Sequence, residues 1–356
     1  MADSYSLSCD TMALIASSFR HPKGVDMWQI VGHDRVIRLI QKSIETNRVS
    51  HAYLFSGPSQ VGKSTLAREF AKALNCLEPD SPCGRCRSCQ KIDKGVHPDV
   101  QSIDLEEGAK SISIDAIRRL QEGVALRPAE GRYKVYILQE AERLSEQAAN
   151  ALLKTLEEPP PSVVLVLTTL EAGMLLPTLV SRCQQVDLRP VPRAELERTL
   201  VQRYSASPDQ ARLVATLAGG RVGWAFQAMS NPAMLEKRSE LLNRLADFPT
   251  ADRVSRFAYA AELANLYSRN PEAVRDILES WQCWWRDLLL TRLGLRELVV
   301  NVDLEEKLID TCRDYSIETL SRMVRAIQDT ISMLSQNVNP RLSLEVLMLN
   351  APRGNK

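Results

Sequence analysis

A run of residues in the first quarter of the chain has the types and spacing of a phosphate-binding loop. In the pattern GxxxxGKS, two glycines let backbone N–H groups approach phosphate oxygens, the lysine reaches the outer phosphates and the serine offers its hydroxyl to Mg²⁺. We therefore predict that the chain binds ATP together with Mg²⁺. The residues predicted to surround the nucleotide are Gly57, Pro58, Ser59, Gln60, Val61, Gly62, Lys63, Ser64 and Thr65.

Four cysteines follow shortly after the loop. Their spacing, C-x6-C-x2-C-x2-C, brings four soft thiolates within reach of one tetrahedral zinc ion, with no coordination position left open. We therefore expect a structural Zn²⁺; reduced surface cysteines and a redox pair are the alternatives. His97 is interpreted as a turn residue and not as a further ligand. The predicted zinc ligands are Cys76, Cys83, Cys86 and Cys89.

Strands that alternate with helices must position both groups. The apolar run 51–55 predicts a buried strand leading into the loop, and a helix is predicted from Lys63 to Leu77. Ser145 is expected to cap another helix, which ends before the prolines that follow Glu158. This order indicates an α/β domain with a parallel five-stranded sheet. The other four strands are predicted at 100–105, 133–138, 163–167 and 184–188.

The end of the third predicted strand carries the next candidate chemistry. ATP hydrolysis usually needs an acidic residue there to hold Mg²⁺, but this chain has Gln139, followed by Glu140. An amide is a weaker Mg²⁺ ligand than a carboxylate. Glu140 remains available as a catalytic residue that orients water, and the alternative is a solvated acid at a helix start. We therefore expect ATP binding with weak or absent turnover.

The composition excludes several classes of protein. The 356 residues include 45 basic and 44 acidic side chains, so no strong net field draws the chain to nucleic acid or to a membrane. The remaining cysteines are scattered singly, which favours a reducing compartment. The N-terminus lacks the basic region of a secretory signal, and no apolar run is long enough to span a bilayer. A cytoplasmic protein is expected.

A change of pattern near residue 190 indicates further domains, because everything beyond it reads as helical. We expect a flexible tail at 1–25, a nucleotide-binding domain at 26–190 with its zinc module at 76–89, and helical domains at 191–245 and 246–356. Three tryptophans share one helix face by their spacing. A position in a helical core is favoured over a base-stacking platform, because basic residues do not interleave them. They are Trp281, Trp284 and Trp285.

Several segments together resemble the ATPase subunits of the bacterial DNA polymerase III clamp loader. The resemblance covers about residues 28–230 and continues, through 337–345, into the last helix. It implies an AAA+ fold, in which the two helical domains are a small lid and a collar for oligomerisation. The segments that carry it are Ile30–His33, His51–Phe55, the cysteine cluster with Gly95–Asp99, Asn150–Pro159 and Ser181–Cys183.

The resemblance implies a role for Arg182 that the neighbouring sequence alone does not indicate. In this family the matching arginine projects into the ATP site of the adjacent subunit, so Arg182 is the expected arginine finger, acting in trans. The implied partners are the gamma/tau and delta subunits of a pentameric ring, the sliding clamp, and primed DNA reached through the assembled complex. No membrane partner is expected.

Three departures favour a stator over an ATP-hydrolysing motor within the family. Gln139 replaces the Walker B aspartate, Gly223 stands where the motor carries its sensor 2 arginine, and the chain ends soon after the collar. The complete phosphate loop points the other way, so a gamma/tau motor subunit stays as an alternative. A zinc-containing nucleic-acid-binding module with a vestigial phosphate loop is the alternative from another class, and the balanced charge disfavours it.

Overall fold

The computed structural model describes residues 28–106, 108–109, 111–247, 251–336 and 338–352. The predicted tail at 1–25 lies outside this range. The chain forms two compact units, residues 1–189 and 190–356. Within the described residues, no helix combines the length and the apolar character needed to cross a bilayer.

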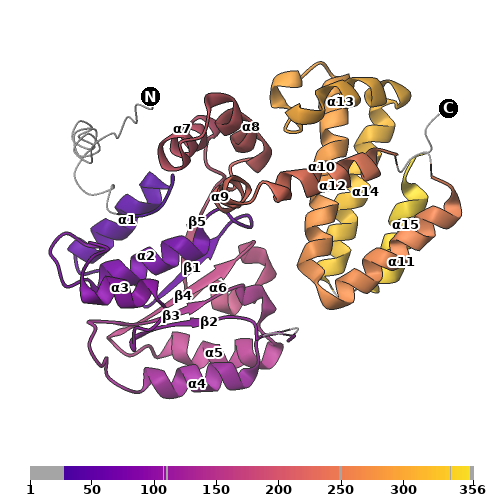
Figure 1. Ribbon diagram of the computed structural model, residues 1–356. Helices are drawn as coiled ribbons and strands as arrows, with labels where there is room; N and C mark the ends of the chain where they lie inside the picture. The colour runs from indigo at the N-terminus through magenta and orange to yellow at the C-terminus, as the bar shows by residue number, and fades with distance from the viewer. Residues whose placement is uncertain (1–27, 107, 110, 248–250, 337, 353–356) are drawn as a thin grey trace, which may run out of the picture. The chain divides into compact units, whose positions relative to one another are not determined.

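The first unit is built on a parallel sheet of five strands, which confirms the predicted fold class (Figure 1). The strands lie in the order β2-β3-β4-β1-β5, with every neighbouring pair parallel. The central strands are buried along their whole length because helices cover both faces, as continuous apolar runs require. The strands are β1 (Ala52–Ser56), β2 (Val100–Ile103), β3 (Lys134–Leu138), β4 (Val163–Thr169) and β5 (Gln184–Asp187).

Alternate residues of the central strands divide between two apolar cores. One core joins Tyr53 and Phe55 of β1 to α1 and α2, and the other joins Leu54 to α4 and α5 on the opposite face (Figure 1). Ser145 caps α5 as predicted, because its Oγ accepts a hydrogen bond from the Ala148 N–H at 3.2 Å. The helices of this unit are α1 (Asp34–Glu45), α2 (Lys63–Asn75), α3 (Arg87–Asp93), α4 (Ile114–Val124), α5 (Glu146–Glu157) and α6 (Pro177–Val180).

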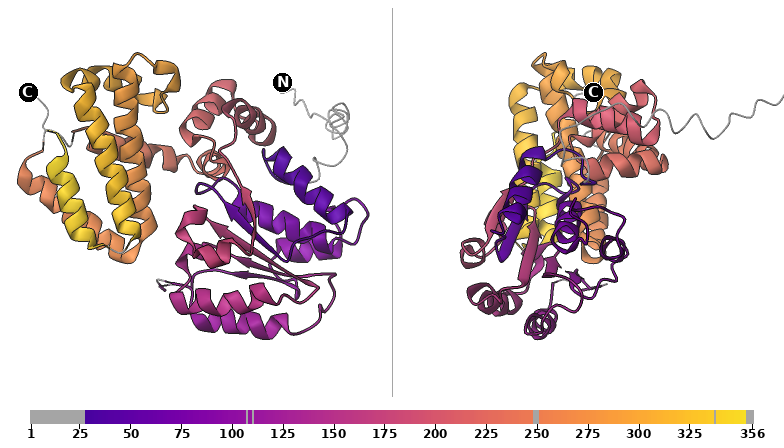
Figure 2. Two further views of the ribbon diagram at one scale, coloured as in Figure 1. Left: turned by 180° about the vertical axis from the view of Figure 1, so that it is seen from behind. Right: turned by 90° about the vertical axis from the view of Figure 1, so that its left-hand side faces the viewer.

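Every regular element among the described residues of the second unit is a helix, as predicted. Three short helices come first, and in the longer ones that follow α11 packs beside α15 and α12 beside α14 (Figures 1 and 2). They are α7 (Arg193–Tyr204), α8 (Pro208–Ala218), α9 (Val222–Ser230), α10 (Ala233–Asp247), α11 (Arg253–Arg269), α12 (Pro271–Arg292), α13 (Glu305–Thr311), α14 (Ile317–Ser335) and α15 (Pro340–Asn350).

The three tryptophans of α12 form the centre of this helical core. Trp281, Trp284 and Trp285 are at most 1% exposed, and the Trp285 ring meets that of Tyr315 edge-on at 5.3 Å. The core interpretation of these residues is therefore confirmed. A ring buried to this extent has no face on which a base could stack.

Candidate functional site

The phosphate loop lies at the carboxyl end of β1 and ends on the first turn of α2. Gly57 has φ +148°, and a Cβ there would lie 2.3 Å from the carbonyl oxygen of Leu188. Only glycine fits this position without moving the backbone. Gly62, with φ +114°, is the N-cap of α2, so the positive end of the helix dipole faces the loop. Strand, loop and helix stand in the context that phosphate binding requires.

The loop lysine bonds to the loop itself. Lys63 Nζ donates to the carbonyl oxygens of Gly57 at 2.6 Å and of Pro58 at 2.8 Å. Burial lowers the pKa of Lys63, although the nearby carboxylates of Glu142 and Glu140 oppose that shift. The ammonium group therefore sits at the mouth of the loop, close to where outer phosphates would lie.

Gln139, the residue predicted to weaken Mg²⁺ binding, lies directly beside the loop. Gln139 follows β3, and its Oε1 accepts a hydrogen bond from Ser64 Oγ at 2.6 Å. Thr168 Oγ1, near the end of β4, donates to the same oxygen at 3.2 Å and accepts from the Glu140 N–H at 3.1 Å. A neutral amide thus occupies the place where a carboxylate would share Mg²⁺ with Ser64.

Thr168 was not predicted as a site residue. The available signal was a pair of threonines ending an otherwise apolar buried strand, beside the strand that feeds Gln139. Because carboxyl ends of parallel strands lie at one edge of a sheet, polar residues there converge on the same site. Spacing along the chain could not reveal the bond between Thr168 and Gln139, since 29 residues separate them.

Two carboxylates stand near the loop, and they have different surroundings. Glu140 has φ +48° and its Oε2 lies 2.6 Å from Arg143 Nε, with its side chain 46% exposed. Glu142 accepts from the Leu170 N–H at 3.3 Å through Oε1, while its buried Oε2 has no hydrogen-bond partner within the described chain. The carbonyl oxygen of Leu170 accepts a hydrogen bond from the Gly57 N–H. Leu170 therefore links the Glu142 carboxylate to the loop through its two backbone hydrogen bonds.

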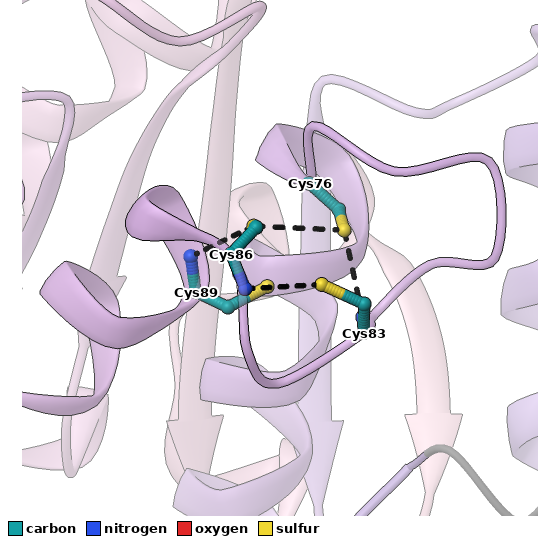
Figure 3. A group of neighbouring side chains, drawn as sticks. All are labelled: Cys76, Cys83, Cys86 and Cys89. Atoms are coloured by element: carbon teal, nitrogen blue, oxygen red, sulfur yellow. Dashed lines mark hydrogen bonds between the residues drawn. The ribbon is translucent and has the colours of Figure 1, made fainter.

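The four cysteines converge from three segments. Cys76 ends α2, Cys83 lies in the following loop, and Cys86 and Cys89 lie at the start of α3 (Figure 3). All four Sγ atoms lie within 4.8 Å of one another. A tetrahedral site with Zn–S bonds of about 2.3 Å places sulfurs about 3.8 Å apart, and Cys76 Sγ lies 3.9 Å from Cys86 Sγ. The donor set therefore fits one zinc ion.

Backbone donors prepare the cluster for negative charge. N–H groups of Cys83, Cys86 and Cys89 donate to the sulfurs of Cys76, Cys83 and Cys86, at 3.4, 3.3 and 3.5 Å. Burial raises the pKa of Cys76 and of Cys89. Burial also acts on Cys86, but N–H donors outweigh it and lower the pKa of that thiol to about 6. Such donors favour the thiolate form that binds metal.

His97 braces the cysteine module from the side. The residue is 3% exposed, its Nδ1 accepts from the Asp99 N–H at 3.1 Å, and its Nε2 lies 3.2 Å from the hydroxyl of Ser88. With Nδ1 accepting, the neutral ring carries its proton on Nε2 and donates to Ser88, the neighbour of Cys89. Both ring nitrogens are engaged, which agrees with the interpretation that His97 is not a ligand.

Arg182 lies on the turn between α6 and β5. Its Nη1 donates to the carbonyl oxygen of Thr178 at 3.0 Å and its Nη2 to Glu157 Oε1 at 2.7 Å. The side chain is 35% exposed. Gly223, predicted to replace a sensor arginine, lies in the first turn of α9 in the second unit.

Two family profiles cover most of the chain. The profile described as DNA polymerase III, delta subunit, matches residues 32–192, and its C-terminal counterpart matches 232–352. The DNA polymerase III subunit delta' of Bacillus subtilis is 30% identical over 321 residues, which are 90% of this chain and 96% of that protein. The subunit tau of the same organism is 29% identical over 344 residues, 90% of this chain but only 60% of the relative.

Among solved structures, a gamma-subunit-related protein of DNA polymerase III from Thermotoga maritima matches with 21% identity and a TM-score of 0.38. The match covers 89% of this chain and 97% of that one. The resemblance seen in the sequence is confirmed by the match to subunit delta' over nearly the whole length of both proteins. The chain belongs to the delta-prime family of DNA polymerase III clamp-loader subunits, which is related to gamma/tau.

Proposed function

We propose that this chain acts as the stator of a clamp loader and supplies Arg182 in trans to the ATP site of a neighbouring subunit. The observation that supports this most directly is the pair of anchors on Arg182, which holds a partly exposed guanidinium on a turn. A fixed guanidinium can stabilise the charge that develops on a transferred phosphoryl group. The chain's own site, in contrast, has Gln139 beside Ser64.

The partners follow from the same proposal. Gamma/tau and delta subunits would complete a pentameric ring with this chain, and the ring would load the sliding clamp onto primed DNA. The nearly balanced charge supports DNA contact through the assembly and not through this chain alone. The helical domains at 191–245 and 246–356 would then serve as lid and collar.

The experiment replaces Arg182 with alanine in a loader reconstituted with its partner subunits. Arginine fingers contribute about 10³–10⁵-fold to turnover at the site they serve, so we expect clamp- and DNA-stimulated ATPase to fall while the ring still assembles. Arg189→Ala is the control, because Arg189 is an exposed arginine that lies beyond the opposite end of β5. Unchanged turnover in Arg182→Ala would show that the chain has another role.

The intact phosphate loop favours a second candidate, a gamma/tau-type motor. We infer ATP binding for this chain from Gly57, Gly62 and Lys63, whose geometry fits a bound triphosphate. A motor would turn over ATP steadily as a purified chain, and Lys63→Ala would abolish that turnover. Tight binding of ATP without turnover supports the stator.

We also infer that the four cysteines hold one structural Zn²⁺. Elemental analysis of the purified chain should find about one zinc per chain, and Cys89→Ser should release it and lower the melting temperature, because structural zinc contributes directly to folding. Cys183→Ser is the control, since Cys183 lies outside the cluster. If the chain contains no zinc after expression and purification in the presence of zinc, the cysteines do not form a structural zinc site.

A further inference from the structure

One of the two anchors of Arg182 is a carboxylate at the end of α5. Glu157 is the last residue of α5, and its Oε1 accepts from Arg182 Nη2 at 2.7 Å. The second anchor is the Thr178 carbonyl in α6, at 3.0 Å from Nη1. Two acceptors on different helices therefore fix the plane of the guanidinium, and not only the position of its end.

We propose that Glu157 is a positioning residue for Arg182. This inference rests on the proposed function of Arg182. A guanidinium has five N–H donors, so two anchors leave three donors for phosphate oxygens. An arginine side chain is long and has many rotamers, and fixing it before the phosphate arrives removes an entropic cost from the catalytic step. Glu157 does not touch the nucleotide in this role; it acts through Arg182.

A purely structural role for the ion pair is the simplest alternative. The two side chains are 35% and 49% exposed, and ion pairs at such exposure contribute little to stability. The α6 segment is instead fixed to α5 by Leu179, which is 1% exposed and packs in the same core as Leu152 and Leu156. Packing holds the two helices together, so the polar contact is left to orient the guanidinium.

The neighbouring Glu158 offers a matched control. It is the exposed C-cap residue of the same helix, and no hydrogen bond or ion pair of its side chain is seen within the described chain. Glu157→Ala removes the anchor, Glu157→Asp withdraws the carboxylate by one methylene, and Glu157→Gln keeps an oxygen that accepts from Nη2 at the same distance. The aspartate variant tests the length of the side chain, and the glutamine variant tests its charge.

The variants are tested in the reconstituted loader by steady-state ATPase with clamp and primed DNA. We expect Glu157→Ala and Glu157→Asp to lower kcat about 3- to 10-fold with KM for ATP unchanged, as for loss of orientation at a catalytic group. Glu157→Gln should recover most of the rate, and Glu158→Ala should match the unmodified loader. In an Arg182→Ala background, Glu157→Ala should cause no further loss.

The outcomes separate this inference from the proposed function. If Arg182→Ala itself leaves turnover unchanged, the proposed function fails and the inference falls with it. If Arg182→Ala lowers turnover but Glu157→Ala and Glu157→Asp do not, only the positioning role is overturned. An equal further loss from Glu157→Ala in both backgrounds would also overturn it. Because Glu157→Asp keeps charge and helix, its result stands even if the alanine variant assembles poorly.

Discussion

At the scale of single residues, Gln139 limits what the proposed nucleotide site can do. The amide oxygen of Gln139 accepts hydrogen bonds from Ser64 and from Thr168. The side chain thus stands beside Ser64, as a Walker B aspartate would, but it carries no negative charge. Mg²⁺ prefers carboxylate and water oxygens and binds a neutral amide less strongly. In the proposed nucleotide site the loop would hold phosphates, while the neighbouring group that would hold the metal lacks a charge.

Gln139→Asp should restore this metal contact. We expect the Mg²⁺-dependent part of ATP affinity to rise about 10-fold, because a carboxylate adds a charged ligand to the ion, with measurable turnover by the isolated chain. Gln139→Asn is the control, since it has the length of aspartate without the charge. Titration of ATP with and without Mg²⁺ measures the effect. Equal affinities for the two variants would mean that position 139 does not meet the metal.

At the scale of elements, Asp99 connects β2 to the segment before β3. The buried carboxylate accepts the N–H groups of Ala129, Glu130 and Gly131, at 2.7, 2.8 and 2.7 Å. Burial raises the pKa of Asp99, but these three donors outweigh it, and the pKa lies below its ordinary value of 3.8. The Asp99 carboxyl is therefore ionised in the folded protein at neutral pH.

Asp99→Asn should destabilise the first unit at neutral pH. An amide leaves N–H donors of the 129–131 segment unpaired, at a cost of about 2–3 kcal/mol in the free energy of unfolding. A carboxyl whose pKa is depressed on folding stabilises above its unfolded pKa, and that stability is lost as the pH falls through the folded pKa. The difference between the two proteins should therefore be full at pH 7 and shrink below about pH 4.

Urea unfolding at neutral and at acidic pH measures this difference. Release of the proposed zinc at low pH would affect both proteins alike, so only the difference between them is informative. Asp104→Asn, an exposed change just beyond the same strand, is the control. A gap that stays constant between pH 7 and pH 3 would mean that the charge of Asp99 contributes nothing.

The elements also show how far sequence patterns reach. All five strands were predicted, as were α2 and α5. The continuous apolar runs of β1, β3 and β4 and the Ser145 cap state local burial directly, whereas the edge strands β2 and β5 carry fewer buried residues. The short helices α3 and α6 were missed. Four cysteines shape the surroundings of α3, and α6 is fixed by packing of Leu179 against α5, so tertiary contacts and not local periodicity define both. For the same reason the contact between Arg182 and Glu157 could not be foreseen.

At the scale of the whole molecule, each of the two units has its own core. The apolar clusters around the sheet belong to the first unit, and one cluster around α12 belongs to the second. Of the 5 tryptophans, Trp28 lies in the first unit and the others lie in the second. Tryptophan fluorescence therefore reports chiefly on the helical unit.

Mg-ATP should stabilise one unit alone. At a concentration about 100 times its Kd, the nucleotide should raise the melting temperature of the first unit by about 5–10 °C. The transition seen by tryptophan fluorescence should stay in place, whereas circular dichroism should show a second transition that moves. Lys63→Ala should abolish the shift. If both probes move together, the units unfold as one cooperative body.

The helix α2 begins at the phosphate loop with Lys63 and ends just before Cys76, the first residue of the cysteine cluster. One residue of an α-helix turns the chain by about 100°. A single insertion or deletion inside α2 would leave both motifs intact in the sequence yet rotate Cys76 away from the other sulfurs. The exposed stretch 77–80 carries no such restriction. In homologous chains, changes of length should gather in that stretch and spare the helix.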